Sequence, residues 1–180
     1  LSENEVFWTD ALLNAEPFTF EAHGAQPLSS KSKSAQVETA TLPISLQNQL
    51  NTAFPTLSLS NAVANLYCCF LSRMADLKSF DIGLGVNTSN DNNQTTKKFI
   101  AQRVPLNLNI DSQQSIRTLM SSLTHYLDSI TKKGSYALDL IPRTQNLTAP
   151  DFPVAIELLK HFEDGSNGDS DTLLLSIQND

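Results

Sequence analysis

The sequence lacks most of the features that assign a protein to a class at once. It has only two cysteines, Cys68 and Cys69, and they are adjacent in the chain. Neighbouring residues of a helix point in different directions, so we expect reduced thiols and no disulfide framework. No apolar run approaches the roughly 18 residues that a membrane span needs. These absences predict a cytoplasmic protein with no membrane partner.

Positive charge is scarce as well. Lysine and arginine number 12 against 19 aspartates and glutamates, which gives a formal net charge of -7. Such a charge repels phosphate backbones and anionic membranes, so nucleic acid is not expected to be a main partner. The first residues, LSENE, are acidic and differ from the basic start of a signal peptide.

The motifs of metal binding and of common catalytic sites are missing. The three histidines, His23, His125 and His161, are far apart and belong to no HExxH or CxxC pattern, so no metal site is expected. There is no GxSxG elbow, no P-loop and no GxGxxG fingerprint. The residues alone therefore predict no complete active site.

The acidic side chains and the thiols do not indicate an active site either. Asp10 with Glu16, or Asp139 with Glu157, are conceivable carboxylate pairs, but nothing in their spacing fixes a shared site. The adjacent cysteines lie in an apolar helical pattern, which favours buried, inert thiols over a nucleophile.

Apolar residues recur at helical spacing in several segments. The expected caps are Ser45 for the second helix, Thr56, Ser58 or Ser60 for the third, and Asp111 or Ser112 for the fourth. Gly134 follows two lysines and should end the fourth helix. The wide apolar stripe of the third helix predicts that it is well buried. The helices are expected at residues 5–15, 45–54, 59–74, near 112–133 and, as a short helix, at 136–141.

Alternating or β-branched patterns predict strands between these helices. The turn-like residues 163–171 suggest that the last two strands form a hairpin. Residues 21–35 are a linker or loop, and residues 87–96 are a polar loop. The strands are expected at residues 36–42, 80–86, 104–110, 152–159 and 172–178. This order predicts one domain over residues 1–180, of the α/β class, with a mixed β-sheet and helices packed on it.

Two glycines interrupt the strand at residues 80–86. Glycine inside a strand marks a bulge, or a place where a ligand or another backbone comes close. For Gly83 and Gly85, packing against the helix at 59–74 is the preferred interpretation, and a ligand role stays open.

Eight segments form an ordered series along nearly the whole chain. They are FWTDALLNAEPFTF, QVETATLP, ISLQNQLNTAF, TLSLSNAVANLYCCFLSRM, LKSFDIGLGVNTSN, KKFIAQRVPLNLNI, KGSYALDLIPR and APDFPVAIEL. The series resembles the second half of the condensation domains of nonribosomal peptide synthetases. The last four segments resemble the family patterns DDVVIGxPVxxR, GFFVNTLPLRL, HQDYPFExL and SPLFxVxFxx.

The matches within these patterns are partial. Four positions depart from them: Asn90 replaces an arginine, Gln102 an asparagine, Lys133 a histidine and Ala137 a proline. The matching positions are Asp81, Ile82, Gly83, Val86, Phe99, Pro105, Leu106, Leu108, Tyr136 and Leu140.

The resemblance implies one lobe of a chloramphenicol acetyltransferase-like fold, in which two similar lobes form a V around a tunnel. This chain would be the C-terminal lobe. The family's HHxxxDG motif lies before this segment, so no catalytic residue is expected here and the fragment alone is expected to be inactive. The tunnel wall or pantetheine-binding residues would be Gly83, Gly85, Asn87 and Gln102.

The resemblance also implies an activity and partners. The parent domain would form an amide between acyl and aminoacyl thioesters, so it would be an acyltransferase. No cofactor would bind directly, because carrier proteins would present 4'-phosphopantetheine arms. The partners would be those carriers and the N-terminal lobe. The departures leave open a non-catalytic carrier-docking or scaffold module, and a generic α/β domain remains a further alternative.

Overall fold

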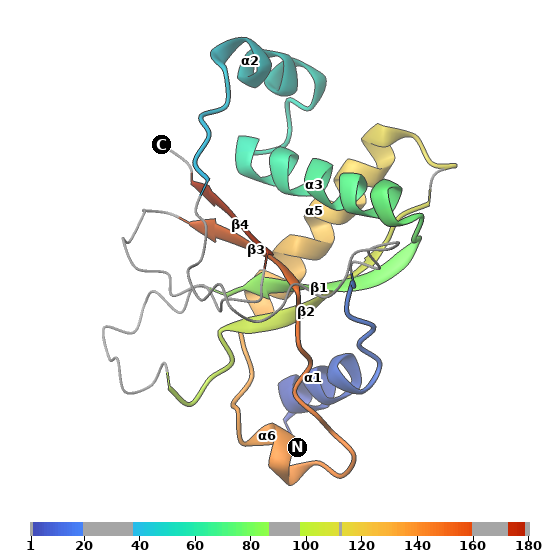
Figure 1. Ribbon diagram of the computed structural model, residues 1–180, viewed down its shortest axis with the longest axis vertical. Helices are drawn as coiled ribbons and strands as arrows, with labels where there is room; N and C mark the ends of the chain where they lie inside the picture. The colour runs from blue at the N-terminus through green and yellow to red at the C-terminus, as the bar shows by residue number, and fades with distance from the viewer. Residues whose placement is uncertain (1, 20–37, 87–97, 112, 160–172, 179–180) are drawn as a thin grey trace, which may run out of the picture.

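The computed structural model describes residues 2–19, 38–86, 98–111, 113–159 and 173–178 (Figure 1). Five helices and four strands are assigned within these ranges. In order, they are α1 Glu3–Leu13, α2 Ile44–Ala53, α3 Leu59–Ala75, β1 Ser79–Gly85, β2 Arg103–Asn109, α5 Ile116–Lys133, α6 Leu140–Arg143, β3 Val154–Leu159 and β4 Leu173–Gln178.

The strands form one mixed sheet in the order β2-β1-β3-β4. Strand β1 pairs with β2 in antiparallel orientation and with β3 in parallel orientation. In Figure 1, α3 and α5 lie above the strands, while α1 and α6 lie below them. The expected α/β class with a mixed sheet is therefore confirmed.

The last two strands do not form the expected hairpin. Strands β3 and β4 are parallel, with Val154 opposite Leu173 and Glu157 opposite Ser176. The hairpin prediction was wrong because turn-like residues between two apolar runs do not reveal whether the second strand reverses direction. Residues 163–171, on which it rested, lie outside the described ranges.

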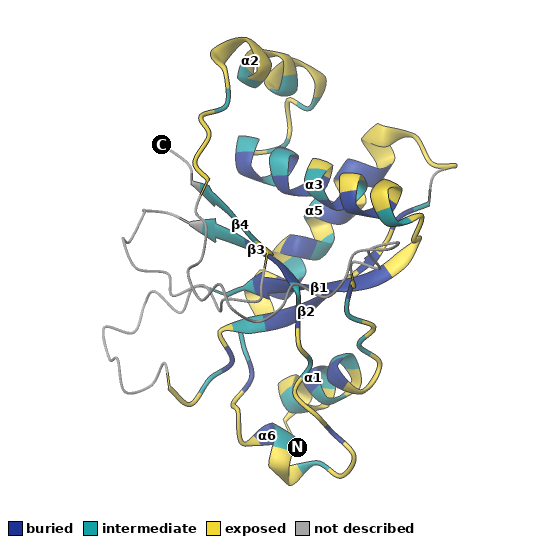
Figure 2. Ribbon diagram, in the orientation of Figure 1, coloured by how far each residue is buried: buried dark blue, intermediate teal, exposed yellow. Residues whose placement is uncertain are grey.

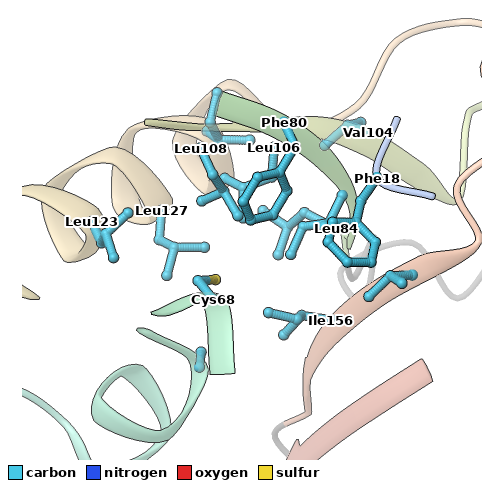
Figure 3. Packing of buried hydrophobic residues seen from close by; sticks show 14 of the residues in the cluster. Phe18, Cys68, Phe80, Leu84, Val104, Leu106, Leu108, Leu123, Leu127 and Ile156 are labelled. Carbon is cyan, nitrogen blue, oxygen red and sulfur yellow. The ribbon is translucent and has the colours of Figure 1, made fainter. Parts of the chain in front are cut away.

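Alternation along the strands produces one fully apolar face. Phe80, Ile82 and Leu84 of β1 are buried, and their β2 partners, such as Leu106, are buried too. Helix α5 adds a row of buried residues at helical spacing, and Cys68 and Leu71 come from α3. Figure 3 shows leucines of α5 and Cys68 of α3 close to this face. The α5 row is Leu119, Leu123, Leu127 and Ile130.

Asn65 joins the two helices above the sheet. Its side chain is fully buried in α3, and its Nδ2 donates to the Met120 carbonyl at 3.1 Å and to Thr124 Oγ1 at 2.7 Å. Because both hydrogen bonds of Nδ2 go to groups of α5, this side chain ties α3 to α5 at one position along the helix.

Helix α3 is only partly buried, against the expectation from its wide apolar stripe. Leu66 is 37%, Phe70 55% and Met74 50% exposed. These residues follow one another at intervals of four, so they form a solvent-facing stripe on the helix, visible in yellow in Figure 2. The stripe was too wide for one sheet to cover.

Helix starts differ from some expected caps. Ser58 caps α3, as one of the three candidates, and accepts from the Asn61 N–H. Helix α2 begins after Pro43 without a side-chain cap, so the expectation for Ser45 was wrong. The cap of α5 is Ser115, which accepts from the Thr118 N–H, so the expectation of Asp111 or Ser112 was wrong. Asp111 instead accepts from the Gln113 N–H in a turn before the helix.

Of the remaining expectations for helices and strands, some are confirmed and others are wrong. Gly134 ends α5 with a positive φ of 72°, as expected from the lysines before it. The strand expected at residues 36–42 was wrong for its described part, because residues 38–42 are irregular. The short helix expected at 136–141 begins later, at Leu140. The linker at 21–35 lies outside the described ranges, and every described helix is too short or too polar to cross a bilayer.

Candidate functional site

The second face of the sheet carries small and polar residues. Because side chains alternate along a strand, Asp81, Gly83 and Gly85 face away from the apolar core. Their β2 partners on this face are Asn107, Pro105 and Arg103, and β3 adds Ala155 and Glu157. We call this surface, defined by these eight residues, the polar face.

Gly83 is required by the close approach of β3. A Cβ atom at this position would lie 3.1 Å from the Cβ atoms of both Ala155 and Phe152. Such contacts are tighter than normal packing, so a side chain would push the two strands apart. The preferred packing interpretation is correct in kind, but the partner is β3 and not α3.

Gly85 leaves room for the side chain of Glu157. A Cβ atom at Gly85 would lie 2.3 Å from Cγ and 3.2 Å from Oε1 of Glu157. The half-buried Glu157 therefore lies across β1 above the glycine. In the strand register Gly85 is opposite both Arg103 and Glu157, so these three residues form one row across the polar face.

Gln102 lies at the same end of the sheet. It is exposed, directly precedes β2, and its carbonyl accepts a hydrogen bond from the Val86 N–H at 3.2 Å. The structure thus brings Gly83, Gly85 and Gln102 to neighbouring positions. Asn87, the fourth expected tunnel residue, lies outside the described ranges.

Asp81 is the buried carboxylate of the polar face, with an exposed fraction of 2%. The Glu16 N–H donates to its Oδ2 at 2.7 Å, and the Asn107 amide lies 3.5 Å from the same oxygen. Burial raises the pKa of Asp81 above its ordinary 3.8, and the two hydrogen bonds offset part of that rise. Backbone hydrogen bonds with Glu16 and Phe18 flank this residue, so Asp81 holds the segment after α1 against β1.

Replacing Asp81 with asparagine is expected to remove a pH dependence of stability. Because the folded state holds the Asp81 proton more tightly than the unfolded state, the contribution of Asp81 to wild-type stability falls as pH rises from 3.8 through the raised pKa. The asparagine variant lacks this step, so its stability relative to wild type should increase with pH across that window. Urea denaturation at several pH values measures it.

Asp81→Ala is the matched comparison for this prediction. It leaves the Glu16 N–H without its acceptor, which should cost about 1–3 kcal/mol. Identical pH profiles for wild type and the asparagine variant would contradict the assigned role of Asp81.

Two of the family-like segments meet beside this face. Ile100 and Ala137 form an antiparallel bridge, the Ala101 N–H donates to the Tyr136 carbonyl, and the Leu138 N–H donates to the Phe99 carbonyl. The segments KKFIAQRVPLNLNI and KGSYALDLIPR are therefore neighbours in space as well as in order.

A third family-like segment joins them through helix α1. The Tyr136 ring lies 5.8 Å from the ring of Trp8, and Arg143 of α6 pairs with Glu5 at 2.8 Å. Lys133, which stands where the family has a histidine, lies 4.3 Å above the ring of Phe7. This cation–π contact gives the lysine a structural role.

The two thiols differ in burial. Cys68 is buried, and burial together with neighbouring Cys69 raises its pKa to about 12. Burial also raises the pKa of the half-buried Cys69, and Arg73 partly counters that rise. Thiolate chemistry is therefore suppressed at both positions.

Iodoacetamide should distinguish these thiols. At about pH 8 roughly one Cys68 thiol in ten thousand is ionised, so Cys68 should stay unmodified until the chain unfolds, while Cys69 reacts slowly. Peptide mass spectrometry before and after denaturation in urea measures this. Labelling of native Cys68 as fast as Cys69 would show that α3 does not pack as described.

The other candidate groups form no reactive cluster. His125 is exposed on α5, and the other two histidines lie outside the described ranges. Asp139 pairs with Arg143, so it is not a partner for Glu157. Asp10 accepts from the Asn14 amide, whereas Glu16 engages Asp81 through its backbone. No group of three or more possible metal ligands occurs in the described part of the chain.

A separate hollow of about 480 Å³ lies between β2 and α5. Its lining is mostly amides and hydroxyls, with no nucleophile and base in contact. Burial raises the pKa of Tyr126, and a hydrogen bond from the Asn107 backbone partly offsets this rise. The lining residues are Asn107, Asn109, Asp111, Gln114, Leu119, Ser122, Leu123 and Tyr126.

Comparison with known proteins identifies the fold. No protein-family model and no curated protein matches the sequence. The crystal structure of the starter condensation domain of rhizomide synthetase RzmA is similar, with a TM-score of 0.55 at 15% sequence identity. The match covers 98% of this chain and 39% of that chain. This chain has a condensation-domain-like fold. It spans well under half the length of that condensation domain chain.

Sequence reasoning selected part of the candidate site described above. It selected Gly83 and Gly85 from the GxG pattern and Gln102 from the family resemblance. It missed Arg103 and Glu157, which join Gly85 only through the register of three strands. The available signal was a glutamate inside the apolar run FPVAIELL, two residues after Ala155 and therefore on the same side of the strand.

Proposed function

We propose that this chain is the C-terminal lobe of a condensation-type domain that forms amide bonds between carrier-bound thioesters. The condensation-domain-like fold over 98% of the chain supports this proposal. So does the 39% coverage of the similar chain, which suits one lobe of a two-lobe domain.

One observation carries the proposal beyond the fold. The family-like segments occupy neighbouring strands: LKSFDIGLGVNTSN contains β1, KKFIAQRVPLNLNI contains β2, and APDFPVAIEL contains β3 except for its last residue. Gly83 and Gly85 lie together on the polar face, and Gln102 lies at the end of the same strands. Residues from two different strand segments thus converge on one surface, which we assign to the tunnel wall.

The proposed reaction joins an amine to a thioester. The amine nitrogen attacks the thioester carbonyl, the C–N bond forms, the C–S bond breaks, and the pantetheine thiol leaves with a proton derived from the amine. We assign the histidine that moves this proton to the other lobe. This lobe would supply a wall that orients two tethered reactants, which is catalysis by proximity.

The proposed partners follow from this reaction. Carrier proteins would bring both reactants on 4'-phosphopantetheine arms, and the N-terminal lobe would complete the tunnel. We propose that the assembly works in the cytoplasm.

Amide formation by the full-length parent protein tests this proposal. Purified parent would be mixed with carrier proteins loaded with an acyl donor and an aminoacyl acceptor, and the amide product would be detected on the acceptor carrier by mass spectrometry. Where the parent carries an HHxxxDG motif, a variant with both of its histidines replaced is the control, and it should lose the product. Failure with every carrier-bound pair would overturn the assignment.

A second candidate is a non-catalytic carrier-docking or scaffold module. The contact of Lys133 with the Phe7 ring favours it, because a residue that departs from the family pattern is used for packing. The sequence preceding Leu1 in the parent discriminates the two. An intact HHxxxDG motif supports the enzyme, and a broken one supports the module.

A further inference from the structure

We propose that the outer edge of β2 binds an extended peptide of neutral or basic character, which adds to the sheet as a further strand. The hollow between β2 and α5 is the binding site. It lies at the end of β2 away from Gln102 and Gly85, so the inference does not depend on the reaction proposed above.

The backbone of β2 presents hydrogen-bonding groups on its outer side. In the described sheet β2 has one neighbouring strand, β1. The Ile110 N–H donates to the Lys78 carbonyl, so even-numbered residues of this segment face β1 and odd-numbered residues face outward. Pro105, which has no N–H, falls in the outward set, as a proline in an edge strand should. The outward set also includes Asn107 and Asn109.

The outward groups of β2 are only partly used within the fold. The Asn107 N–H donates to the hydroxyl oxygen of Tyr126 on α5. Asn109 is exposed, and no group of the described residues accepts from its N–H. The carbonyls of Asn107 and Asn109 face the same side. One donor and two acceptors therefore remain for a strand that would lie beside this end of β2.

The fold already pairs an extended segment with the same edge. Just before β2, the Ala101 N–H donates to the Tyr136 carbonyl, next to an antiparallel bridge between the two segments. Ala101 is odd-numbered, so the segment after α5 occupies the outer side of the strand there. The edge is thus covered before β2 begins and open at Asn109, which lines the hollow.

The hollow has the size and the walls that a short peptide needs. Its volume is about 480 Å³, within the usual range of ligand sites. Leu119, Ser122, Leu123 and Tyr126 follow one another at intervals of three or four, so one face of α5 forms the wall opposite the strand edge. Backbone partners on one side and an apolar contact for alternate side chains on the other are the two elements of recognition by strand addition.

Charge restricts the occupant. Asp111 is the one charged residue among those that line the hollow, and the whole chain has a net charge of -7. A peptide with a lysine or arginine near Asp111 is therefore favoured over an acidic one. A second copy of this chain suits the edge less well, because both copies carry the same net charge and each lacks a donor at Pro105.

Binding of a synthetic peptide to the 180-residue chain tests the inference. The probe is a fluorescein-labelled peptide, lysine-valine-threonine-valine-threonine-lysine, followed by fluorescence anisotropy. A counterpart methylated on every backbone nitrogen keeps the side chains but has no backbone donor, and it should bind at least tenfold more weakly. A peptide with glutamates in place of the lysines should bind several-fold more weakly.

Asn109→Pro is the decisive variant. It removes the outward N–H and places a ring on the edge, and Pro105 shows that β2 accepts proline at an odd-numbered position. It should weaken binding of the lysine peptide at least tenfold. Asn109→Ala is the matched control, because it keeps the N–H, and its binding should stay within about threefold of wild type.

Unchanged binding in Asn109→Pro, or equal binding of the three peptides, would overturn the inference. Self-association of the chain without peptide, lost in Asn109→Pro, would assign the edge to a second copy and would overturn it as well. Should Asn109→Pro fail to fold, the comparison of the methylated and unmethylated peptides on the unaltered chain still decides. These measurements record no amide formation, so their failure and failure of the proposed function are separate results.

Discussion

Replacing Trp8 with alanine is expected to lower the free energy of unfolding by about 3–5 kcal/mol. The Trp8 side chain is fully buried, and its ring contacts Phe7 at 4.9 Å and Tyr136 at 5.8 Å between centroids. Its removal leaves a cavity between α1 and the segment after α5, which neighbouring rings cannot fill without leaving their own contacts.

Urea denaturation followed by circular dichroism measures this effect, because the variant loses the only tryptophan and with it the fluorescence signal. Val6→Ala on the same helix is the control. Val6 is 53% exposed, and alanine is the better helix former, so its stability should stay within about 0.5 kcal/mol of wild type. A loss below about 1 kcal/mol for Trp8→Ala would show that α1 does not pack on Tyr136.

Replacing Gly83 with valine is expected to cost about 3 kcal/mol of stability. Its Cβ would lie 3.1 Å from the Cβ atoms of Phe152 and Ala155, and two further methyl groups would follow. These neighbouring atoms are attached directly to the backbone of β3 and of the segment before it. They cannot rotate away, so the strain must separate β3 from β1.

Ser79→Val is the control for this prediction. Ser79 is exposed on the same face at the start of β1, where a β-branched residue suits the strand. The two variants should therefore differ clearly in their urea midpoints. A Gly83→Val protein as stable as Ser79→Val would contradict the close contact between β1 and β3.

Local patterns predicted most elements of this fold. The alternation of Phe80, Ile82 and Leu84 gave β1 within one residue, and the lysines before Gly134 marked the end of α5. These signals are short-range: a strand exposes its faces every second residue, and a helix end needs a residue that tolerates positive φ.

The errors arose where distant residues decide. The parallel pairing of β3 and β4 depends on the path between them, and turn-like residues are compatible with either direction. The exposure of Phe70 and Met74 depends on how much of α3 the sheet covers. Helix α2 begins at Ile44, after Pro43, although Ser45 has the better capping side chain, so the chain direction before a helix can outweigh a local propensity.

In the candidate site, too, local sequence patterns predicted some residues, and contacts between distant residues decided the others. Glycines in a strand pattern were enough to select Gly83 and Gly85, since a missing side chain implies a close neighbour. Identifying that neighbour required the register between β1 and β3, which are separated by 68 residues from Gly85 to Val154. Glu157 therefore remained one acidic residue among many until the strands were paired.

The placement of β3 inside the sheet also bears on the order of folding. Strand β1 is complete at Gly85, but the partner on one of its sides begins at Val154, and Trp8 packs on Tyr136. During synthesis, β1 and β2 can pair early as an antiparallel unit, while the other edge of β1 stays open until the last sixth of the chain has emerged. Contacts this distant in sequence make folding slow and leave an apolar edge available to other chains. Until β3 has emerged, the nascent chain therefore carries an unpaired strand edge on β1, open to pairing with other chains.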